Sequence, residues 1–291
     1  MSAGENQQQR EGQVPEQRFD VLAGFDVRER TAVITGGSGQ LGRAMAAALA
    51  AAGARVAILG RHVQTAQAVA ASIHAEGGAA LGIACDVLNR AELEQSQAEV
   101  RSTFGLVDIL INAAGGNSPA ATTSAGQSFF DLDIGAASQV FDLNFTGTFQ
   151  SCQVFARDMV ERGEGSIVNI TSMSALRPLT RIPAYSAAKA AVVNFTEWLA
   201  VHLAQEYSPR IRVNALAPGF FLTEQNRYLL LDAEGKLTPR GQAIISHTPT
   251  GRLGQPEDLL GTLLWLVSPA SAFVTGAVIP VDGGFASFSG V

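Results

Sequence analysis

Short apolar runs alternate with helix-like stretches along this chain from Thr31 to its end. Each run is apolar throughout, which is typical of parallel strands buried on both faces of a sheet. Parallel neighbours need crossover connections, and the helix-like stretches supply them. The pattern therefore predicts an α/β fold: a single-domain, doubly wound parallel sheet of about seven strands with helices on both faces. We expect strands at 31–35, 55–59, 80–86, 108–112, 166–171, 212–217 and 277–281. We expect helices at 41–52, 64–76, 90–104, within 138–161, and at 185–207 and 256–267.

Two segments fall outside this alternation. Residues 1–20 are polar, with several glutamines and acids and no periodicity, so we expect a flexible N-terminal arm before a domain over 21–291. Residues 220–254 are too many for a tight connection between elements. A long insertion of this kind usually serves as a substrate loop or lid, and we expect that role here.

The composition argues against several classes of protein. Of the 291 residues 47% are hydrophobic, enough for a large core, and the net charge of −6 argues against non-specific nucleic-acid binding. The longest apolar runs, such as 259–267, are well short of the roughly 20 residues that a membrane helix needs. Cys85 and Cys152 are poor material for a disulfide framework, and the first residues do not resemble a secretory signal. We therefore expect a cytoplasmic protein with no nucleic-acid or membrane partner.

A glycine-rich turn joins the first expected strand to the first expected helix. It reads Thr35-Gly-Gly-Ser-Gly-Gln-Leu-Gly42. Glycines allow backbone amides to approach a pyrophosphate, and the amino end of a helix favours its negative charge. In this context the turn predicts dinucleotide binding by Gly36, Ser38, Gly39, Gln40, Leu41 and Gly42.

The end of the second strand bears on the choice of coenzyme. NAD-binding units usually place an acid there for the ribose hydroxyls, whereas this chain has Gly60-Arg61. Because a guanidinium pairs with a 2′-phosphate, NADP(H) is favoured over NAD(H); an exposed loop arginine is the alternative. After the third strand, Asp86-Val87 is interpreted as an adenine contact or as a helix cap before Asn89.

Tyr185 and Lys189 are four residues apart in an expected helix, so both side chains lie on one face. Their free pKa values are about 10 and about 10.4, and a lysine held nearby as a cation favours the phenolate. We therefore expect a lowered pKa for Tyr185 and proton exchange near neutrality. Ser172 ends a strand-like run and is expected to hold a substrate oxygen beside the tyrosine. Taken alone, a Tyr-x-x-x-Lys spacing is usually an accident of helix composition.

Together these motifs, in their order and spacing, resemble the short-chain dehydrogenase/reductase family over about residues 25–291. The resemblance implies a Rossmann-like fold and a nicotinamide-dependent oxidoreductase acting on CH–OH groups. It also implies that Lys189 contacts the nicotinamide ribose and that Asn144 holds a proton-relay water. The catalytic tetrad that it implies is Asn144, Ser172, Tyr185 and Lys189.

The same resemblance extends the expected cofactor site. Two positions depart from the family pattern: Gln40 stands where glycine is usual, and Ala113 where asparagine is usual. Both departures concern cofactor affinity more than chemistry. The further cofactor contacts that the resemblance implies are Asn112, Ala113, Ala114, Gly115, Tyr185, Lys189, Pro218, Gly219 and Thr223.

Arg177 and Arg181 lie between Ser172 and Tyr185 and indicate an acidic substrate. Arginine pairs with carboxylates through two hydrogen bonds and amides suit sugar hydroxyls, so a polyhydroxy acid fits. Either arginine could instead be solvated or lie in a subunit interface. The expected substrate-binding residues are Ser174, Arg177, Arg181, Asn226, Arg227 and His247.

Residues 177–185, 221–227 and 281–291 resemble the D-mannonate oxidoreductase, or fructuronate reductase, branch of the family. This implies D-fructuronate and D-mannonate as the leading substrate pair. The alternatives are a reductase of another ketone, such as a keto-gluconate or a 3-oxoacyl thioester, and a non-catalytic NAD(P)-binding sensor.

The four histidines are scattered and none has zinc-like spacing, so we predict no catalytic metal. The expected helix within 138–161 is more apolar than one buried face requires. In the resembled family this helix and the next, which carries Trp198, pair across dimers, which implies a homotetramer or homodimer.

Overall fold

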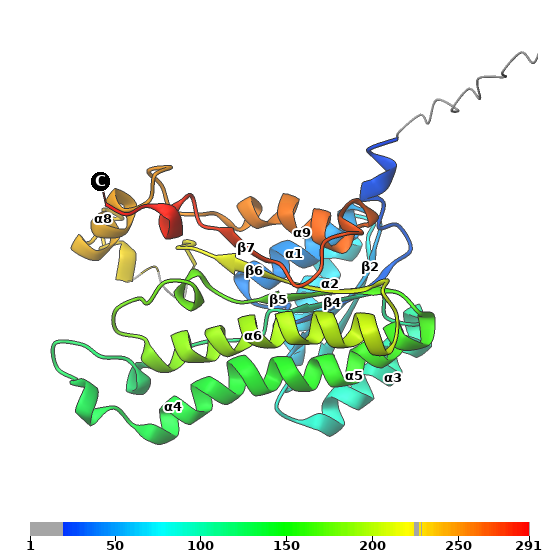
Figure 1. The fold of residues 1–291 in the computed structure, drawn as a ribbon, viewed down its shortest axis with the longest axis horizontal. Coiled ribbons are helices and arrows are strands. Elements are labelled where there is room, and N and C mark those ends of the chain that lie inside the picture. Colours follow the sequence, from blue (N-terminus) through cyan, green and yellow to red (C-terminus); the bar gives the residue numbers. More distant parts are fainter. Residues whose placement is uncertain (1–19, 224–226, 228, 291) are drawn as a thin grey trace, which may run out of the picture.

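The computed structural model describes residues 20–223, 227 and 229–290 of the chain. Residues 1–19 of the expected N-terminal arm, and Asn226 among the expected substrate residues, lie outside the described residues. The described chain forms one sheet between two layers of helices (Figure 1).

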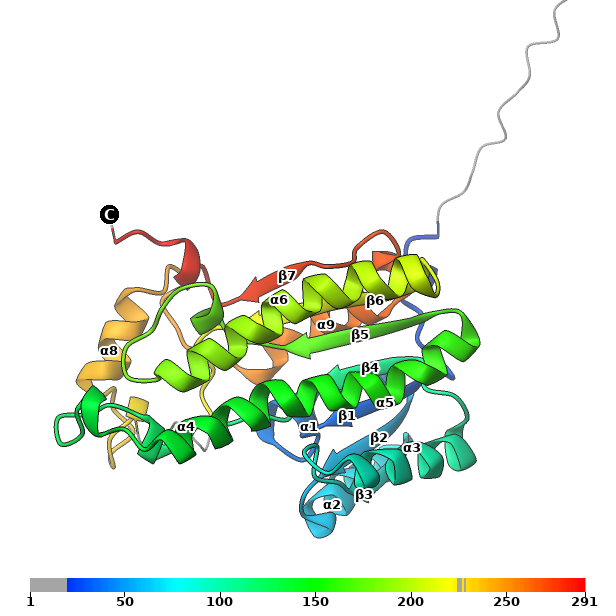
Figure 2. The same ribbon diagram turned by 60° about the horizontal axis from the view of Figure 1, so that its bottom comes forward.

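Seven parallel strands of the described chain form the sheet, in the order β3-β2-β1-β4-β5-β6-β7. This confirms the predicted doubly wound architecture. The order reverses between β1 and β4, which opens a crevice at the carboxyl ends of those strands, where ligands of such folds bind. The strands run toward the end of the molecule that carries α8, Pro239–Ser246 (Figures 1 and 2). The bounds are β1 Thr31–Thr35, β2 Arg55–Gly60, β3 Ala79–Ala84, β4 Ile109–Asn112, β5 Gly165–Ile170, β6 Ile211–Pro218 and β7 Val278–Val281.

Helices cover both faces of the sheet, and each face has its own apolar core. In β1, Ala32 and Ile34 belong to the core beneath α1, α2 and α9, whereas Val33 belongs to the core beneath α3, α5 and α6. This two-sided burial explains why the strands read as continuous apolar runs. The helix bounds are α1 Gln40–Ala51, α2 Val63–Ala75, α3 Arg90–Phe104, α4 Ile134–Phe141, α5 Gly147–Arg162, α6 Pro183–Glu206 and α9 Leu260–Val267. No helix among the described residues is both long enough and apolar enough to cross a membrane.

The helix expected within 138–161 is in fact interrupted. A π-helical turn, Asp142–Thr146, joins α4 to α5, and the amide of Gly147 donates across it to the carbonyl of Asp142. Helical periodicity does not reveal such a widened turn, because the apolar positions before and after it still follow a helical repeat. The helix expected at 256–267 likewise begins as a 3-10 turn, Pro256–Leu259, before α9.

The segment expected as a loop or lid, 220–254, contains α8, which the sequence analysis did not anticipate. Its start carries two ordinary signals. The Thr238 hydroxyl accepts a hydrogen bond from the amide of Gly241 at 3.1 Å, and Pro239 occupies the first helical position. The helix brings new side chains to the carboxyl-end edge of the sheet.

Candidate active site

The glycine turn after β1 has the close backbone approaches that its sequence predicts. Gly36 has φ +65°, and a Cβ there would lie 2.7 Å from the Cα of Ala114. A Cβ on Gly42 would lie 2.3 Å from the carbonyl oxygen of Gly36. The N-cap of α1 is Gly39, which has no side chain to satisfy the first amides of the helix. A pyrophosphate fits this arrangement, because the glycines allow a close approach of the backbone and the helix dipole favours an anion.

Gln40, the departure from the family's glycine pattern, bridges two parts of the site. Its Nε2 donates to the carbonyl of Leu222 at 3.2 Å, which ties the turn to the segment that follows β6. In that segment, the amide of Gly219 donates to Val281 at 3.0 Å, and a Cβ on Gly219 would lie 2.6 Å from the Cβ of Asp282. Pro218 and Gly219 therefore lie at the same edge as the glycine turn.

The end of β2 lies close to the glycine turn and is followed by an arginine that is not ion-paired among the described residues. A Cβ on Gly60 would lie 2.6 Å from the Ser38 hydroxyl, so a larger residue at position 60 would displace that side chain. Arg61 is exposed and has no ion pair among the described residues. An unpaired guanidinium next to a dinucleotide turn is chemically suited to a phosphate.

Asp86 does not cap the helix that follows it. The N-cap of α3 is Asn89, whose side chain accepts from the amides of Ala91 and Glu92. The Asp86 carboxylate accepts from the Leu88 amide at 3.0 Å, and Val87 beside it is buried. Of the two interpretations of Asp86, the helix cap is therefore wrong.

Asn112 ends β4 in a buried polar chain rather than in an open pocket. Its Nδ2 donates to Asn169 Oδ1 at 2.8 Å and to Cys152 Sγ at 3.2 Å. Asn169 in turn donates to the Thr196 hydroxyl of α6 at 2.9 Å. These bonds link the ends of β4 and β5 to α6, the helix that carries Tyr185. Residues 113–115 continue from Asn112 toward the glycine turn, where the amide of Ala114 donates to the Thr35 hydroxyl at 3.3 Å.

Asn144 lies in the π-helical turn and is fully buried. Its Nδ2 donates to the carbonyls of Val140 and Gly116, both at 2.7 Å, and its Oδ1 accepts from the Gly116 amide at 3.3 Å. The widened turn thus exposes a helix carbonyl to this side chain and fixes the orientation of the carboxamide.

Lys189 lies four residues after Tyr185 on α6, as the spacing predicts, and is buried. Its Nζ donates to the Ile170 carbonyl at 2.8 Å and lies 5.7 Å from the centre of the Tyr185 ring. The Thr171 hydroxyl donates to the Lys189 carbonyl at 2.9 Å, which fixes α6 against the end of β5. A Cβ on Gly115 would lie 2.6 Å from Asn144 Oδ1 and 3.2 Å from Lys189 Nζ.

This last observation places two members of the predicted tetrad, Asn144 and Lys189, beside the same glycine. Glycine at position 115 leaves a space beside the lysine ammonium and the asparagine carboxamide that any other residue would fill. A nicotinamide ribose fits there, since Lys189 has three donors and one is committed to Ile170. Among the described residues, no cluster of three or more His, Cys, Asp or Glu side chains could hold a metal ion.

The expected lowering of the Tyr185 pKa is not observed. Burial raises the pKa of the Tyr185 phenol, and a hydrogen bond from Ser172 opposes this rise. Burial also lowers the pKa of Lys189 to about 8. The attraction between the two groups favours a lower pKa for the phenol. In the folded protein both groups are also withdrawn from water, which disfavours their charged forms and is not revealed by their spacing in the sequence.

The expected substrate residues have different environments. The Ser174 hydroxyl is buried and has no hydrogen-bond partner among the described residues. Arg177 Nε donates to the Ala286 carbonyl at 3.1 Å, and Arg181 is exposed with its backbone at φ +78°. Arg227 is exposed, and His247 packs against the rings of Phe285 and Phe288 at 4.7 and 5.0 Å.

Arg240 is a residue that the sequence analysis missed. It lies in the first turn of α8 and is partly buried. Burial, and then the charge of Arg181, lower its pKa. The signal that could have found it is the Thr-Pro-Arg start of a helix at residues 238–240, in a segment already expected to cover the site.

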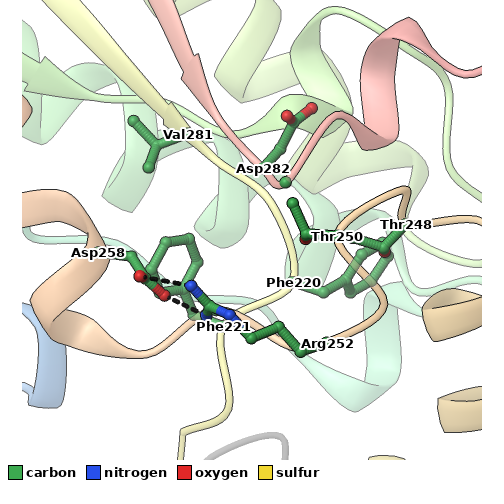
Figure 3. A pocket seen from close by; sticks show the side chains of 10 residues that line it. Phe220, Phe221, Thr248, Thr250, Arg252, Asp258, Val281 and Asp282 are labelled. Atoms are coloured by element: carbon green, nitrogen blue, oxygen red, sulfur yellow. Dashed lines mark hydrogen bonds and ion pairs between the residues drawn. The ribbon is translucent and has the colours of Figure 1, made fainter.

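A cavity of about 210 Å³ lies between the segment after β6 and the end of β7 (Figure 3). It is lined by Phe220 and Phe221 on one side and by Asp282 on the other, and an ion pair of 2.6 Å joins Arg252 to Asp258 at its margin. No member of the tetrad lines it, so we do not assign it to the substrate.

Comparison with known proteins identifies the family. A family model described as short chain dehydrogenase matches residues 30–233. The chain is 52% identical over 271 residues to UxuB of Bacillus subtilis (strain 168), an uncharacterized oxidoreductase; the match covers 90% of this chain and 96% of UxuB.

Two crystal structures extend the comparison. A protein from Haemophilus influenzae, provisionally assigned as a D-mannonate oxidoreductase and holding NAD, is 43% identical with a TM-score of 0.87, and the match covers 94% of this chain and 100% of that one. A gluconate 5-dehydrogenase from Burkholderia cenocepacia J2315, in complex with NADP and tartrate, is 33% identical with a TM-score of 0.81, at coverages of 91% and 98%. This chain therefore belongs to the short-chain dehydrogenases, oxidoreductases that act on CH–OH groups with NAD(P).

Proposed function

We propose that this enzyme transfers a hydride between NAD(P)(H) and the carbonyl of a small acidic sugar, with D-fructuronate and D-mannonate as the leading pair. The observation that carries this proposal is the loop into α6, which brings arginines to the same edge of the sheet as Tyr185. The relative provisionally assigned as a D-mannonate oxidoreductase supports the same substrate class.

The tetrad has a distinct role for each side chain. Tyr185 gives the proton to the carbonyl oxygen, and Ser172, which hydrogen-bonds the phenol, orients that oxygen. Lys189 stabilises the phenolate that remains, and a water held by Asn144 returns a proton to it from solvent. The nicotinamide supplies the hydride when bound, and its oxidised form adds a positive charge that favours the phenolate. A positive charge there would oppose the rise in the Tyr185 pKa that burial causes.

We propose NADP(H) as the favoured coenzyme. Arg61 is exposed without an ion pair in the described chain, and Gly60 contributes no carboxylate that would repel a 2′-phosphate. The relatives differ on this point, since one holds NAD and the gluconate 5-dehydrogenase holds NADP.

The direct test compares the initial rates of NADPH and NADH oxidation by the purified enzyme with D-fructuronate. We expect turnover with both coenzymes, faster with NADPH, and no turnover for Tyr185→Phe despite normal coenzyme binding. Faster turnover with NADH would contradict the role of Arg61. Turnover of a keto-gluconate but not of D-fructuronate would favour the second candidate, which the gluconate 5-dehydrogenase relative supports.

Three further properties are part of the proposal. The segment 220–254 covers the substrate through α8. The apolar face of α5 and α6 pairs with a second copy of the chain, in a homotetramer or homodimer. The enzyme works in the cytoplasm, where sugar acids and reduced coenzymes are both present.

A further inference from the structure

Two arginines from distant parts of the sequence lie at the carboxyl-end edge of the sheet, and neither has an ion pair among the described residues. Arg181 precedes α6, and Arg240 lies in the first turn of α8. Burial and, after it, the charge of Arg181 lower the pKa of Arg240, so the two guanidinium groups are close enough for their charges to interact. Figures 1 and 2 both show α8 at the end of the molecule where α6 begins.

Several arginines elsewhere in the described chain have acidic partners. Arg30 contacts Asp108 at 2.9 Å, Arg101 contacts Asp158 at 3.1 Å, and Arg252 contacts Asp258 at 2.6 Å. Neither Arg181 nor Arg240 has an ion pair within the described ranges, although the whole chain has 26 acidic and 20 basic residues. A shortage of acids therefore does not explain the unpaired arginines.

The backbone at Arg181 is held in an unusual conformation. Its φ of +78° lies in the left-handed region, which a long side chain seldom adopts. The Arg181 carbonyl accepts from the Thr123 amide at 2.9 Å, a contact between two loops at this edge. Backbone strain of this kind persists only where the surrounding structure holds the residue in place, and it clusters at ligand-binding and active sites.

Some of the neighbouring polar side chains already have a hydrogen-bond partner, and others have none among the described residues. Arg177, the other arginine of this loop, already donates to the Ala286 carbonyl. The Ser174 hydroxyl is 4% exposed and has no partner in the described chain, and it lies two residues after Ser172. The open groups are thus two guanidiniums and a buried hydroxyl, which together match a carboxylate and an alcohol.

We propose that Arg181 and Arg240 jointly bind the carboxylate of the substrate, so that α8 carries half of an acid-recognition site. The inference rests on the proposed function in that the acid and the reduced carbonyl belong to one molecule. Binding of a carboxylate between the two guanidiniums removes their repulsion, which makes the acid a better ligand than its neutral analogue.

The test measures ligand binding in the enzyme loaded with reduced coenzyme, by the change in nicotinamide fluorescence. D-Mannonate and D-gluconate are the acidic ligands and D-mannitol is the neutral one. We expect Arg181→Gln and Arg240→Gln each to weaken binding of the acids about tenfold or more, with binding of mannitol and coenzyme unchanged. Arg210→Gln is the matched control, because this exposed arginine precedes β6 at the opposite edge of the sheet, and it should change binding by less than about twofold. Arg240→Lys keeps the charge without the paired geometry and should give an intermediate loss.

The outcomes separate this inference from the proposed function. If the enzyme reduces D-fructuronate and both glutamine variants bind D-mannonate like the wild type, the carboxylate site is wrong and the function stands. If D-fructuronate is not a substrate but another sugar acid needs both arginines to bind, the site stands and the substrate assignment fails. Equal losses for acids and for mannitol would overturn the site, because they would show a general disturbance of α8.

Discussion

At the scale of single residues, the predicted catalytic lysine is buried at a cost to the stability of the fold. Lys189 is 4% exposed, and its charged form loses hydration that one hydrogen bond to Ile170 does not fully replace. Its pKa is therefore lowered from 10.5 to about 8, which corresponds to about 3 kcal/mol. Such a cost is characteristic of a site selected for chemistry rather than for stability.

The first prediction is that Lys189→Met makes the protein more stable and inactive. Between pH 8 and 10.5 the unfolded chain holds more protons at this position than the folded chain, so wild-type stability rises with pH across that window. Below pH 8 the full cost of burying the charged lysine, about 3 kcal/mol, lowers the stability of the wild type. After allowing about 1 kcal/mol for the lost hydrogen bond, we expect a gain of about 2 kcal/mol at pH 7 that shrinks by pH 9.5.

Urea unfolding at the two pH values checks this. Lys236→Met, at an exposed lysine, is the control and should change stability by less than about 0.5 kcal/mol. A loss of stability in Lys189→Met at pH 7 would show that the ammonium is better solvated in the folded protein than its burial indicates.

At the scale of elements, the features that depend on local sequence pattern were predicted correctly. The continuous apolar runs predicted the strands, because each strand is buried against two cores. The glycine turn lies where it was expected, and the four-residue spacing brings Lys189 close to the Tyr185 ring. The π-helical turn around Asn144 was not predictable, because it changes one hydrogen bond and leaves the apolar spacing intact. The raised pKa of Tyr185 and the approach of Arg240 to Arg181 depend on packing between distant segments, which local patterns do not encode.

The second prediction contrasts two glycines in helices. In Gly42→Ala the new Cβ would meet the Gly36 carbonyl at 2.3 Å, so the turn and α1 must separate. We expect a loss of at least about 2 kcal/mol in stability and an increase of tenfold or more in the KM for coenzyme. In Gly261→Ala on α9 the Cβ meets nothing within 4 Å in the described chain, and we expect a gain of up to about 1 kcal/mol from helix propensity.

Thermal unfolding and coenzyme titration of the two variants provide the measurement. Because both changes add one methyl group to a helix, the comparison removes any general effect of the substitution. Unchanged coenzyme affinity in Gly42→Ala would contradict the assignment of this turn to the pyrophosphate.

At the scale of the whole molecule, one long apolar groove lies away from the predicted active site. It runs between α5 and α6, encloses about 420 Å³, and is lined by rings that include Phe149, Phe195 and Trp198. Trp198 is 55% exposed, yet it stacks on His202 at 4.7 Å and on Phe195 at 6.4 Å. An aromatic surface of this size is typical of a protein interface, and the pairing of two copies would bury it.

The third prediction is that Trp198→Glu breaks this pairing. A charge at the centre of an apolar interface must be desolvated in both copies of a symmetric contact, so each interface loses twice the cost of one side chain. We expect the mass measured by light scattering after gel filtration to fall by half or more, from that of a tetramer or dimer. Leu22→Glu places the same charge at another exposed apolar side chain, which is 82% exposed and lies outside the groove, and should leave the mass unchanged.

An unchanged mass in Trp198→Glu would place the subunit contact elsewhere. A fall in mass with retained turnover would show that each site is complete within one chain, as the positions of Asn144, Tyr185 and Lys189 within one fold indicate.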